Sequence, residues 1–221
     1  MKKAIVLVSG GLDSAVTLYY ALSKGYCAEC VVFDYGQRHC KEVQRAAVIC
    51  RKAGCRLWNV KMSFPWKGSS LVDPGMKLPA RSLAKASRGI PSTYVPARNI
   101  LFLSYAVSLA EARGARAVFI GAHSQDYSGY PDCRPQFYKA FQKAIDAGTR
   151  AGVERRPIKI IAPLIHSGKA GIIRLGKKLG VPFVMTWSCY AGGSRPCGVC
   201  DSCLFRAKGF KQAGFPDPAL E

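Results

Sequence analysis

The residues best suited to chemistry lie close to the N-terminus, directly after the apolar run from Ala4 to Val8. They form the loop Ser9-Gly10-Gly11-Leu12-Asp13-Ser14, and a helical pattern begins immediately behind it. This order predicts a strand, a glycine-containing turn and the start of a helix. Glycines allow the backbone to approach an anion closely, and the free N–H groups at a helix start attract negative charge. We therefore expect this loop to bind phosphate.

The spacing of the loop differs from two common phosphate-binding motifs. It lacks the lysine of the G-x-x-x-x-G-K-S/T motif and the glycine spacing of the G-x-G-x-x-G motif. Its pattern, S-G-G-x-D-S, resembles the pyrophosphate loop of the N-type ATP pyrophosphatases, which transfer AMP to a substrate oxygen and release pyrophosphate. Asp13 favours this interpretation because a carboxylate beside a phosphate site is suited to coordinating Mg²⁺. The alternative is an ordinary strand-to-helix turn capped by Asp13 or Ser14.

A second group of chemically capable residues lies near the C-terminus. Four cysteines, Cys189, Cys197, Cys200 and Cys203, occur there within a glycine-rich segment. Their spacing allows four sulfur atoms to surround a tetrahedral Zn²⁺. Because all four ligands come from the protein, this metal would stabilise the C-terminal segment and would not act in catalysis. An iron–sulfur cluster and a pair of disulfide bonds are the alternatives.

The other cysteines are expected to be structural. Cys27 and Cys30 flank the start of a predicted strand, where residues three apart point to opposite faces, so we interpret them as core residues and not as a redox pair. Cys133 lies in a polar loop, and we expect it to form part of the wall of a site and not to act as a nucleophile. Three further thiols are predicted to be small buried residues: Cys40, Cys50 and Cys55.

The composition limits the class of protein. A chain of 221 residues, 49% of them hydrophobic, can form one α/β core with a small appendage. The 33 basic and 13 acidic residues give a formal net charge of +20, which favours anionic partners such as phosphorylated ligands or nucleic acid. The basic residues are scattered, so we interpret them as a solvated basic surface, and nucleic acid is not required as a partner.

No segment predicts export or membrane insertion. The apolar run that ends at Val8 is interrupted at once by Ser9 and the two glycines, unlike a signal peptide. The longest other apolar stretch, from Ile100 to Ala110, is too short to span a bilayer. We therefore expect a soluble, cytoplasmic protein that has no membrane partner.

Short apolar strands alternate with helical patterns along the chain, which predicts a doubly wound parallel α/β fold. In such sheets ligands bind beyond the carboxyl ends of the strands, where the Ser9–Ser14 loop falls. The irregular stretch 63–92 is expected to form a loop or lid beside the site. The predicted strands are 4–9, 29–34, 56–60, 117–121 and 158–162, and the predicted helices are 14–24, 38–53, 99–113, 135–148 and 169–179. Four glycines stand where helices should end: Gly25, Gly54, Gly114 and Gly180.

Three further segments are rich in polar and aromatic residues and fall beyond predicted strands or before a predicted helix. They are Phe33–His39, Ser92–Asn99 and Asp126–Arg134. Any one of them could consist of caps, packing residues and surface charges. Because all three should lie beside the phosphate loop, we expect their side chains to complete a binding site.

Taken together, these motifs closely resemble one family, the 7-cyano-7-deazaguanine synthases, which are ATP-dependent ligases of the queuosine and archaeosine pathways. The resemblance covers nearly the whole chain and rests on the segments 9–14, 33–39, 94–99 and 121–134, on Lys169 with Ala170, and on the four cysteines. It implies a Rossmann-like, adenine nucleotide alpha hydrolase-like domain, for which we expect residues 1–185, followed by a zinc knuckle and tail, residues 186–221. It also implies one zinc ion per chain, a homodimer, and conversion of 7-carboxy-7-deazaguanine, ammonia and ATP into the nitrile.

The implied reaction needs positioning and charge stabilisation and no covalent nucleophile. A carboxylate resists ammonia because oxide is a poor leaving group, whereas adenylation turns the same oxygen into a good one. We expect Asp13, Arg98 and Lys169 to act in catalysis. The expected ATP and Mg²⁺ site is Ser9, Gly10, Gly11, Leu12, Asp13 and Ser14, and the expected substrate site is Tyr35, Arg98, Asp126, Ser128, Tyr130 and Asp132.

One residue departs from the family pattern, and two other classes of function stay open. Gly171 follows Lys169 and Ala170, where members of the resembled family usually carry an acidic residue. One alternative function is a related ATP pyrophosphatase, which either modifies tRNA or stops at the amide and attaches the deazaguanine to a partner protein. The other is a non-enzymatic zinc-knuckle binding module, which would leave the phosphate loop unexplained.

Overall fold

The computed structural model describes residues 2–38, 40–77, 89–123 and 129–219, and it is built around a five-stranded sheet in the order β3-β2-β1-β4-β5. Every neighbouring pair of strands is parallel. The chain moves outward from β1 to β3 and then crosses to the other side for β4, so the switch point lies between β1 and β4. The strands are β1 (Lys2–Leu7), β2 (Tyr26–Asp34), β3 (Arg56–Lys61), β4 (Ala117–Phe119) and β5 (Lys159–Ile161).

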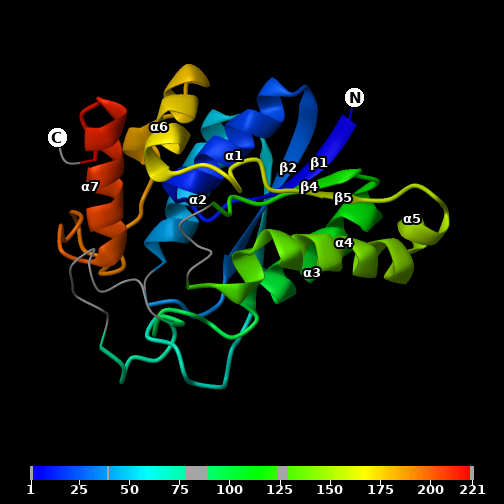
Figure 1. The fold of residues 1–221 in the computed structure, drawn as a ribbon, viewed down its shortest axis with the longest axis horizontal. Helices are drawn as coiled ribbons and strands as arrows, with labels where there is room; N and C mark the ends of the chain where they lie inside the picture. The colour runs from blue at the N-terminus through cyan, green and yellow to red at the C-terminus, as the bar shows by residue number, and fades with distance from the viewer. Residues whose placement is uncertain (1, 39, 78–88, 124–128, 220–221) are drawn as a thin grey trace.

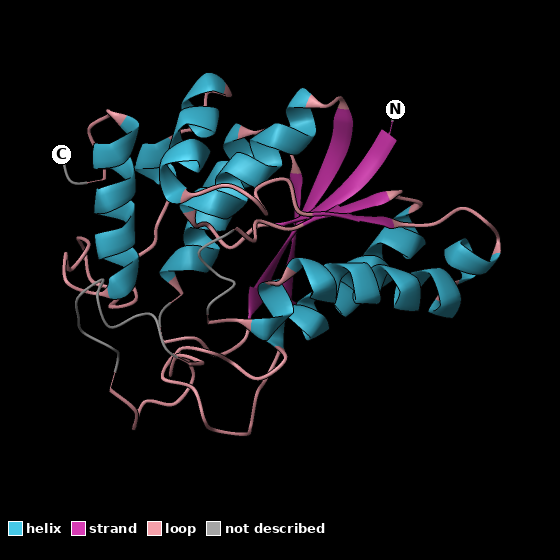
Figure 2. Cartoon of the chain, in the orientation of Figure 1, coloured by secondary structure: helices cyan, strands magenta, loops and turns pink. Residues whose placement is uncertain are grey.

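Helices cover both faces of the sheet, which confirms the predicted doubly wound arrangement (Figures 1 and 2). One face carries α1 (Leu12–Ser23), α2 (Lys41–Lys52) and α6 (Lys169–Lys178), with α7 (Asp201–Ala213) packed beside α6. The other face carries α3 (Arg98–Arg113) and α4 (Pro135–Gly148), and α4 leads into the short α5 (Arg150–Val153). Within the described ranges, two 3-10 turns complete the elements, η2 (Pro131–Cys133) and η3 (Phe183–Met185).

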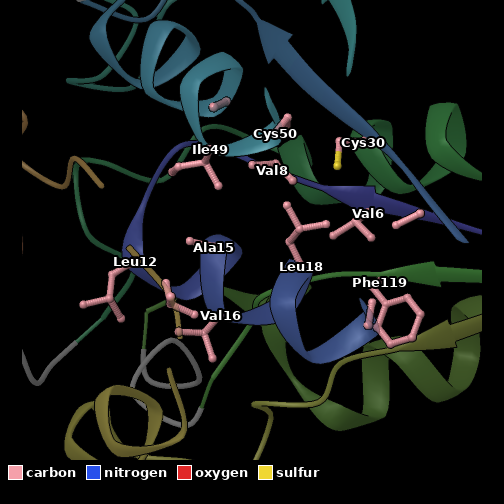
Figure 3. Close-up of a cluster of buried hydrophobic side chains, with 14 of the residues drawn as sticks. Val6, Val8, Leu12, Ala15, Val16, Leu18, Cys30, Ile49, Cys50 and Phe119 are labelled. Carbon is pink, nitrogen blue, oxygen red and sulfur yellow. The ribbon is translucent and has the colours of Figure 1, made fainter. Parts of the chain in front are cut away.

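Alternation along β1 divides the core into two layers. Val6 and Val8 face the α1 side, whereas Ile5 and Leu7 face the α3 side, because successive side chains of a strand point to opposite faces. Val6 pairs with Cys30 of β2 and with Phe119 of β4, and all three lie in the same layer (Figure 3). The central strand is therefore buried on both faces, as expected where helices cover both sides of a parallel sheet.

The five strands and five helices predicted from the sequence are all present. Their ends shift by a few residues, with β2 starting earlier than predicted and β4 and β5 shorter. The four glycines expected at helix ends all have positive φ angles, between 65° and 76°. Two helices were not predicted, the short α5 and the longer α7. The pattern of α7 is weak because two of the clustered cysteines occupy its N-cap and its first turn, and Gly209 interrupts its centre.

Two of the predictions made for the cysteines are wrong. Cys27 and Cys40 are exposed, not buried. Cys27 stands at the start of β2, paired with the exposed Lys3, before the strand enters the core. Cys40 is exposed because it precedes the first turn of α2 at the surface. Cys30 and Cys50 are buried as predicted, and Cys55 is half-buried.

The C-terminal segment is joined firmly to the main sheet domain. Phe210 of α7 belongs to the same core layer as Val6, and it packs edge-on against Phe183. Arg206 and Asp217 form a buried bidentate ion pair, with Nε–Oδ2 and NH2–Oδ1 distances of 2.7 and 2.8 Å. The same guanidinium donates to Thr186 Oγ1, so it ties the tail to the segment that precedes the cysteines. Among the described residues, no helix is long and apolar enough to cross a membrane.

Candidate active site

The phosphate-type loop has a well-defined internal structure. The backbone N–H of Ser9 donates to Ser14 Oγ at 3.1 Å, and this hydroxyl donates to the carbonyl of Gly11 at 3.0 Å. Gly11 is the N-cap of α1, and no side chain caps that helix. The N–H groups of its first turn, at Leu12, Asp13 and Ser14, have no acceptor within the helix and are available to an anion.

Gly10 is required for packing as well as for its backbone conformation. Its φ angle is 83°, in the left-handed region that disfavours other residues. A Cβ atom here would lie 2.2 Å from the carbonyl oxygen of Glu42 and 2.8 Å from the nitrogen of Ala46. Any larger residue would push the loop away from α2. From the sequence, Gly10 and Gly11 were both expected to allow an anion to approach the backbone. In the structure, Gly10 instead allows α2 to pack closely on the loop.

Three charged or titratable side chains meet beside this loop. Lys169 Nζ donates to both oxygens of Asp13 at 2.8 Å and lies 3.1 Å from His123 Nε2. His123 Nε2 is 3.5 Å from Asp13 Oδ2. Asp13 lies in the first turn of α1, His123 follows β4, and Lys169 is the first residue of α6. The switch point of the sheet therefore brings together Asp13 and Lys169, two of the three residues predicted to act in catalysis.

The charge of Asp13 is strongly stabilised. Burial alone would raise the pKa of this carboxyl, but the adjacent Lys169 and His123 outweigh it and hold the pKa well below its usual range. Asp13 is therefore ionised at neutral pH. An ionised carboxylate of this kind can bind a cation, while Lys169 can turn toward a phosphate as a point charge.

His123 was missed by the sequence analysis. It is 5% exposed and contributes its Nε2 atom to the cluster with Lys169. The available signal was its place just beyond the end of β4, at the edge of the sheet where ligands bind. In the sequence, no second ligand-type residue stands at a fixed spacing from His123, so no motif indicated it. Its place in the cluster becomes visible only in the fold.

A second cluster surrounds Arg98 at the start of α3. Its NH1 donates to the hydroxyl of Tyr35 at 3.1 Å, and its guanidinium lies 6.0 Å from the ring centre of Phe102. Glu42 faces the same space, where burial raises the pKa of its carboxyl to about 7 although Arg98 opposes the rise. Ala97, just before Arg98, has a φ angle of 55°, an uncommon conformation that sets the direction in which α3 begins.

Two adjoining cavities lie at this edge of the sheet. The first, of about 320 Å³, is lined by loop residues including Ser9, Gly11 and Ser14, and by Tyr35 and Arg98. The second, of about 230 Å³, is lined by His123 and Lys169 and by the start of α7. Both cavities share six lining residues: Leu12, Asp13, Tyr130, Ser188, Tyr190 and Ser202. Asp13 therefore stands on the border between two binding spaces.

The structure does not place all predicted substrate residues in these cavities. Tyr130 lines both, and its hydroxyl is 2.7 Å from Thr93 Oγ1. Asp132 is not among the lining residues, and its Oδ2 accepts a hydrogen bond from the backbone N–H of Asn99 at the start of α3. Cys133 lines the first cavity as a wall residue and accepts a hydrogen bond from Asn99 Nδ2. Asp126 and Ser128 lie outside the described residues.

The four clustered cysteines form a candidate metal centre. Their sulfur atoms all lie within 4.8 Å of one another. Zinc–sulfur bonds of about 2.3 Å in a tetrahedron place the sulfurs about 3.8 Å apart, so the group fits such an ion. Cys189 Sγ accepts hydrogen bonds from the backbone N–H groups of Ala191 and Cys197, at 3.4 and 3.3 Å. A sulfur that accepts two N–H groups in this way is held in place to act as a metal ligand.

The cysteine segment packs directly on the phosphate-type loop. The backbone N–H of Trp187 donates to the carbonyl of Gly10 at 2.9 Å, and the indole N–H donates to the carbonyl of Cys189 at 2.8 Å. Lys41, the first residue of α2, lies 3.9 Å from the ring centre of Trp187 and donates to the carbonyls of Gly193 and Ser194. The loop and the cysteine segment therefore form one structural unit.

The fold and the loop define a Rossmann-like, adenine nucleotide alpha hydrolase-like α/β protein, and two solved structures share this fold over 99% of the chain. The NMN synthetase from Francisella tularensis matches with a TM-score of 0.52 and 16% identity, over 80% of that chain. The predicted subunit of a tRNA methyltransferase from Methanocaldococcus jannaschii matches with a TM-score of 0.51 and 13% identity, over 91% of that chain. At these identities the likeness concerns the fold alone.

The sequence comparisons identify the family. The family model described as queuosine biosynthesis protein QueC matches residues 3–214. A relative from Nostoc punctiforme named 7-cyano-7-deazaguanine synthase is 50% identical over 222 residues, covering 99% of each chain. One of the same name from Thermoplasma acidophilum is 48% identical over 217 residues, covering 98% of this chain and 91% of the relative. The chain therefore belongs to the QueC family and is an enzyme of that family, which confirms the resemblance drawn from its motifs.

Proposed function

We propose that the chain is an ATP-dependent ligase that converts 7-carboxy-7-deazaguanine and ammonia into 7-cyano-7-deazaguanine. The observation that carries the proposal is the contact of Asp13 with Lys169 and His123 at the border of two cavities, one of which contains the phosphate-type loop. A reaction that joins a triphosphate to an acid needs two adjoining spaces with positive charge where they meet. Membership of the QueC family and the names of the curated relatives support the substrate.

In the first half-reaction, a carboxylate oxygen of the substrate attacks the α-phosphorus of ATP, and pyrophosphate leaves. Ammonia then attacks the acyl carbon, AMP leaves with the former carboxylate oxygen, and one proton is released as the amide forms. The N–H groups of the α1 start bind the leaving pyrophosphate, while Lys169 stabilises the charge that develops on the phosphate. Arg98, beside Tyr35, contributes a second positive charge from the first cavity.

In the second half-reaction, the amide oxygen attacks the α-phosphorus of a second ATP, again with loss of pyrophosphate. Loss of AMP and of the remaining N–H protons then gives the nitrile. The same loop and the same Lys169 serve both steps because each step is a transfer of AMP to an oxygen at the same carbon. No group of the chain needs to form a covalent bond to the substrate.

Two metal ions fit the chain. Asp13 is the residue that would hold Mg²⁺, because its carboxylate stays ionised and is 26% exposed, and both of its oxygens become available when Lys169 turns toward phosphate. Mg²⁺ supplies charge neutralisation for the triphosphate. The four clustered cysteines would hold one structural Zn²⁺, since four sulfur donors at tetrahedral spacing leave no open position for substrate.

Three expectations from the sequence accompany this proposal. They are a homodimer in solution, a cytoplasmic location, and a division into an α/β domain of residues 1–185 and a knuckle and tail of residues 186–221. The family resemblance supports the homodimer. The cytoplasmic location is supported by the many free cysteines, because thiols stay reduced in that compartment. Light scattering of the purified protein measures the oligomeric state directly.

The direct test is a product assay by mass spectrometry. Purified protein is incubated with 7-carboxy-7-deazaguanine, ammonium, ATP and Mg²⁺, and AMP, pyrophosphate and the cyano product are quantified. We expect two AMP for each nitrile formed. An amide that accumulates without nitrile would contradict the proposal and favour the variant that stops at the amide.

An Asp13→Ala variant tests the site within the same assay. We expect pyrophosphate release to be lost while the zinc content stays at one per chain, because Asp13 does not contact the cysteines. The matched control is Glu154→Ala, which removes a surface carboxylate that lines neither cavity and should leave pyrophosphate release unchanged. Undiminished turnover of the Asp13→Ala variant would refute the role of this carboxylate.

A further inference from the structure

The second cavity is formed in part by the metal-binding segment. Its lining includes Asp201, Ser202 and Phe205 from the first two turns of α7, and this helix begins directly after Cys200. Thr93 and Tyr130 line it as well, together with Asp13, His123 and Lys169. The second cavity therefore extends from the start of α7 to Asp13, the residue that also lines the first cavity.

The dimensions of the two cavities suit different ligands. Pockets for drug-sized ligands occupy about 300–1,000 Å³. The second cavity, at about 230 Å³, falls below that range, so it suits one planar bicyclic molecule and not a nucleoside triphosphate. The first cavity is larger, and it alone is lined by Ser9, Gly11 and Ser14 of the phosphate-type loop. The nucleotide therefore belongs in the first cavity.

The lining chemistry of the second cavity matches a guanine-like acid. Tyr130, Tyr190 and Phe205 provide ring faces against which a planar heterocycle can stack. Lys169 and His123 provide positive charge or hydrogen-bond donors for a carboxylate, next to Asp13. Asp201 provides the acceptor that a ring N–H and an exocyclic amino group require.

The Asp201 carboxylate is available for such a contact. Among the described residues, no donor forms a hydrogen bond or an ion pair with it, whereas the nearby Arg206 is fully engaged by Asp217 and Thr186. Asp201 is half-buried at the start of α7, so a contact with ligand would be partly shielded from water.

We propose that the second cavity binds the deazaguanine acid, with Asp201 accepting hydrogen bonds from its guanine-like edge and Phe205 packing on its ring. This inference rests on the proposed function, because it assigns the acceptor of that reaction to a place. In this proposal the four cysteines stabilise the C-terminal segment and also hold the start of α7 in place. The start of α7 forms one wall of the acceptor site. Asp201 is a specificity-determining residue, and Cys200 and Cys203 are positioning residues.

The test measures binding of the acid and of a non-hydrolysable ATP analogue separately, by calorimetry, on the zinc-loaded full-length protein. We expect Asp201→Asn and Phe205→Ala to weaken binding of the acid by about 10-fold or more, as for loss of a charged hydrogen bond or of an aromatic contact. Binding of the ATP analogue should change less than about twofold. Zinc content and the circular dichroism spectrum verify that each variant is folded.

Two controls separate a local role from a general one. Leu204→Ala truncates the neighbouring half-buried side chain of α7, which does not line either cavity, and it should leave acid binding unchanged. A substrate analogue that lacks the exocyclic amino group should bind wild-type protein less well than the natural acid. The Asp201→Asn variant should discriminate much less between the two, which a purely structural role of Asp201 would not produce.

The outcomes are distinguishable from those of the product assay. If the wild type makes the nitrile but both variants bind the acid as the wild type does, the acceptor assignment is wrong and the proposed function stands. If both variants instead lose the ATP analogue, the two cavities are assigned in the wrong order. If the wild type binds the acid through Asp201 but forms no nitrile, the proposed function fails and the acceptor site stands. Failure of the wild type to bind the acid overturns both.

Discussion

The two ends of the chain contribute to one site by different physical means. The N-terminal loop, Ser9–Ser14, acts through its backbone: it follows a buried strand, opens a helix and presents N–H groups. The C-terminal segment acts through side chains that follow the four clustered cysteines. It has little apolar surface apart from Phe210 and its neighbours, so the cysteines are expected to hold it in place. We therefore expect the sheet domain to be stable without a metal and the knuckle to depend on one.

Removal of one of the four cysteines should distinguish the two ends of the chain most clearly. We expect Cys203→Ser to lose the metal and to lower the free energy of unfolding by several kcal/mol, because the binding energy of a structural metal is folding energy. Binding of the deazaguanine acid should be lost with the wall at α7, while the ATP analogue should still bind at the N-terminal loop. Metal analysis by mass spectrometry, thermal unfolding and calorimetry measure the three effects.

Cys27→Ser is the matched control for that variant. Cys27 is an exposed thiol at the start of β2, so its loss should change neither the metal content nor the stability. If Cys203→Ser kept both the metal and acid binding, the knuckle would not support the acceptor site.

At the N-terminal loop, the largest effect on the rate is expected from the loss of Lys169. We expect Lys169→Met to lower the rate of pyrophosphate release about 10²–10³-fold, the usual effect of removing one group that stabilises transition-state charge. The substitution also leaves Asp13 without its nearest cation, so the pKa of Asp13 should rise. Lys178→Met, at the exposed end of the same helix, should have no effect on the rate. A loss of less than tenfold would remove Lys169 from the catalytic group.

These expectations differ in how far the sequence alone supports them. The order of strands and helices and the loop at Asp13 could be predicted because apolar periodicity and glycine spacing are local signals. Lys169 was expected at the site only from a family resemblance, and its contact with Asp13 was not predicted, since 156 positions separate the two residues. His123 and the wall formed by α7 could not be predicted, because their roles arise only when the switch point and the knuckle bring distant segments together. For Asp132, a carboxylate in a polar loop suggested a contact with substrate, and this stays a prediction, since one of its oxygens accepts a hydrogen bond from the backbone at the start of α3.

Glu42 makes the first cavity sensitive to pH. Burial raises its pKa from 4.5 to about 7, so the folded protein holds this proton more tightly than the unfolded chain does. Stability must then fall as the pH rises through this interval, by about 1–3 kcal/mol. The depressed pKa of Asp13 has the opposite sign, but its contribution is lost only at lower pH, as the pH falls below the ordinary value of 3.8.

Urea unfolding at pH 5.5 and pH 8 measures the contribution of Glu42. We expect the wild type to be more stable at the lower pH, and Glu42→Gln to remove most of the difference because the amide does not ionise. Glu154→Gln, which removes a surface carboxylate paired with two arginines, should leave the difference in place. An unchanged pH dependence in Glu42→Gln would mean that another group carries it.

The packing of Lys169 against α7 gives a finer test of how the two regions are joined. A Cβ atom at Gly209 would lie 2.4 Å from Lys169 Cγ, so Gly209→Ala must displace the stem of this lysine. We expect a loss of stability of about 1–3 kcal/mol from overpacking, together with slower pyrophosphate release. Gly171→Ala is the matched control, because no atom lies within 4 Å of its Cβ position, and it should stabilise the helix slightly. Equal rates in the two variants would show that α7 does not position Lys169.

The smallest expected effect concerns the departure from the family pattern at Gly171. The first turn of α6 contains no acidic residue, and the position has open space. Gly171→Glu should therefore stabilise the protein by about 0.3–1 kcal/mol through the helix dipole. A carboxylate two positions after Lys169, in the same first turn of α6, should also lower the local positive charge and alter the affinity for the ATP analogue or for the acid. If calorimetry shows both affinities unchanged while stability rises, this position serves the helix and has no role in the site, whereas a changed affinity would place the family's acidic residue within reach of the ligand.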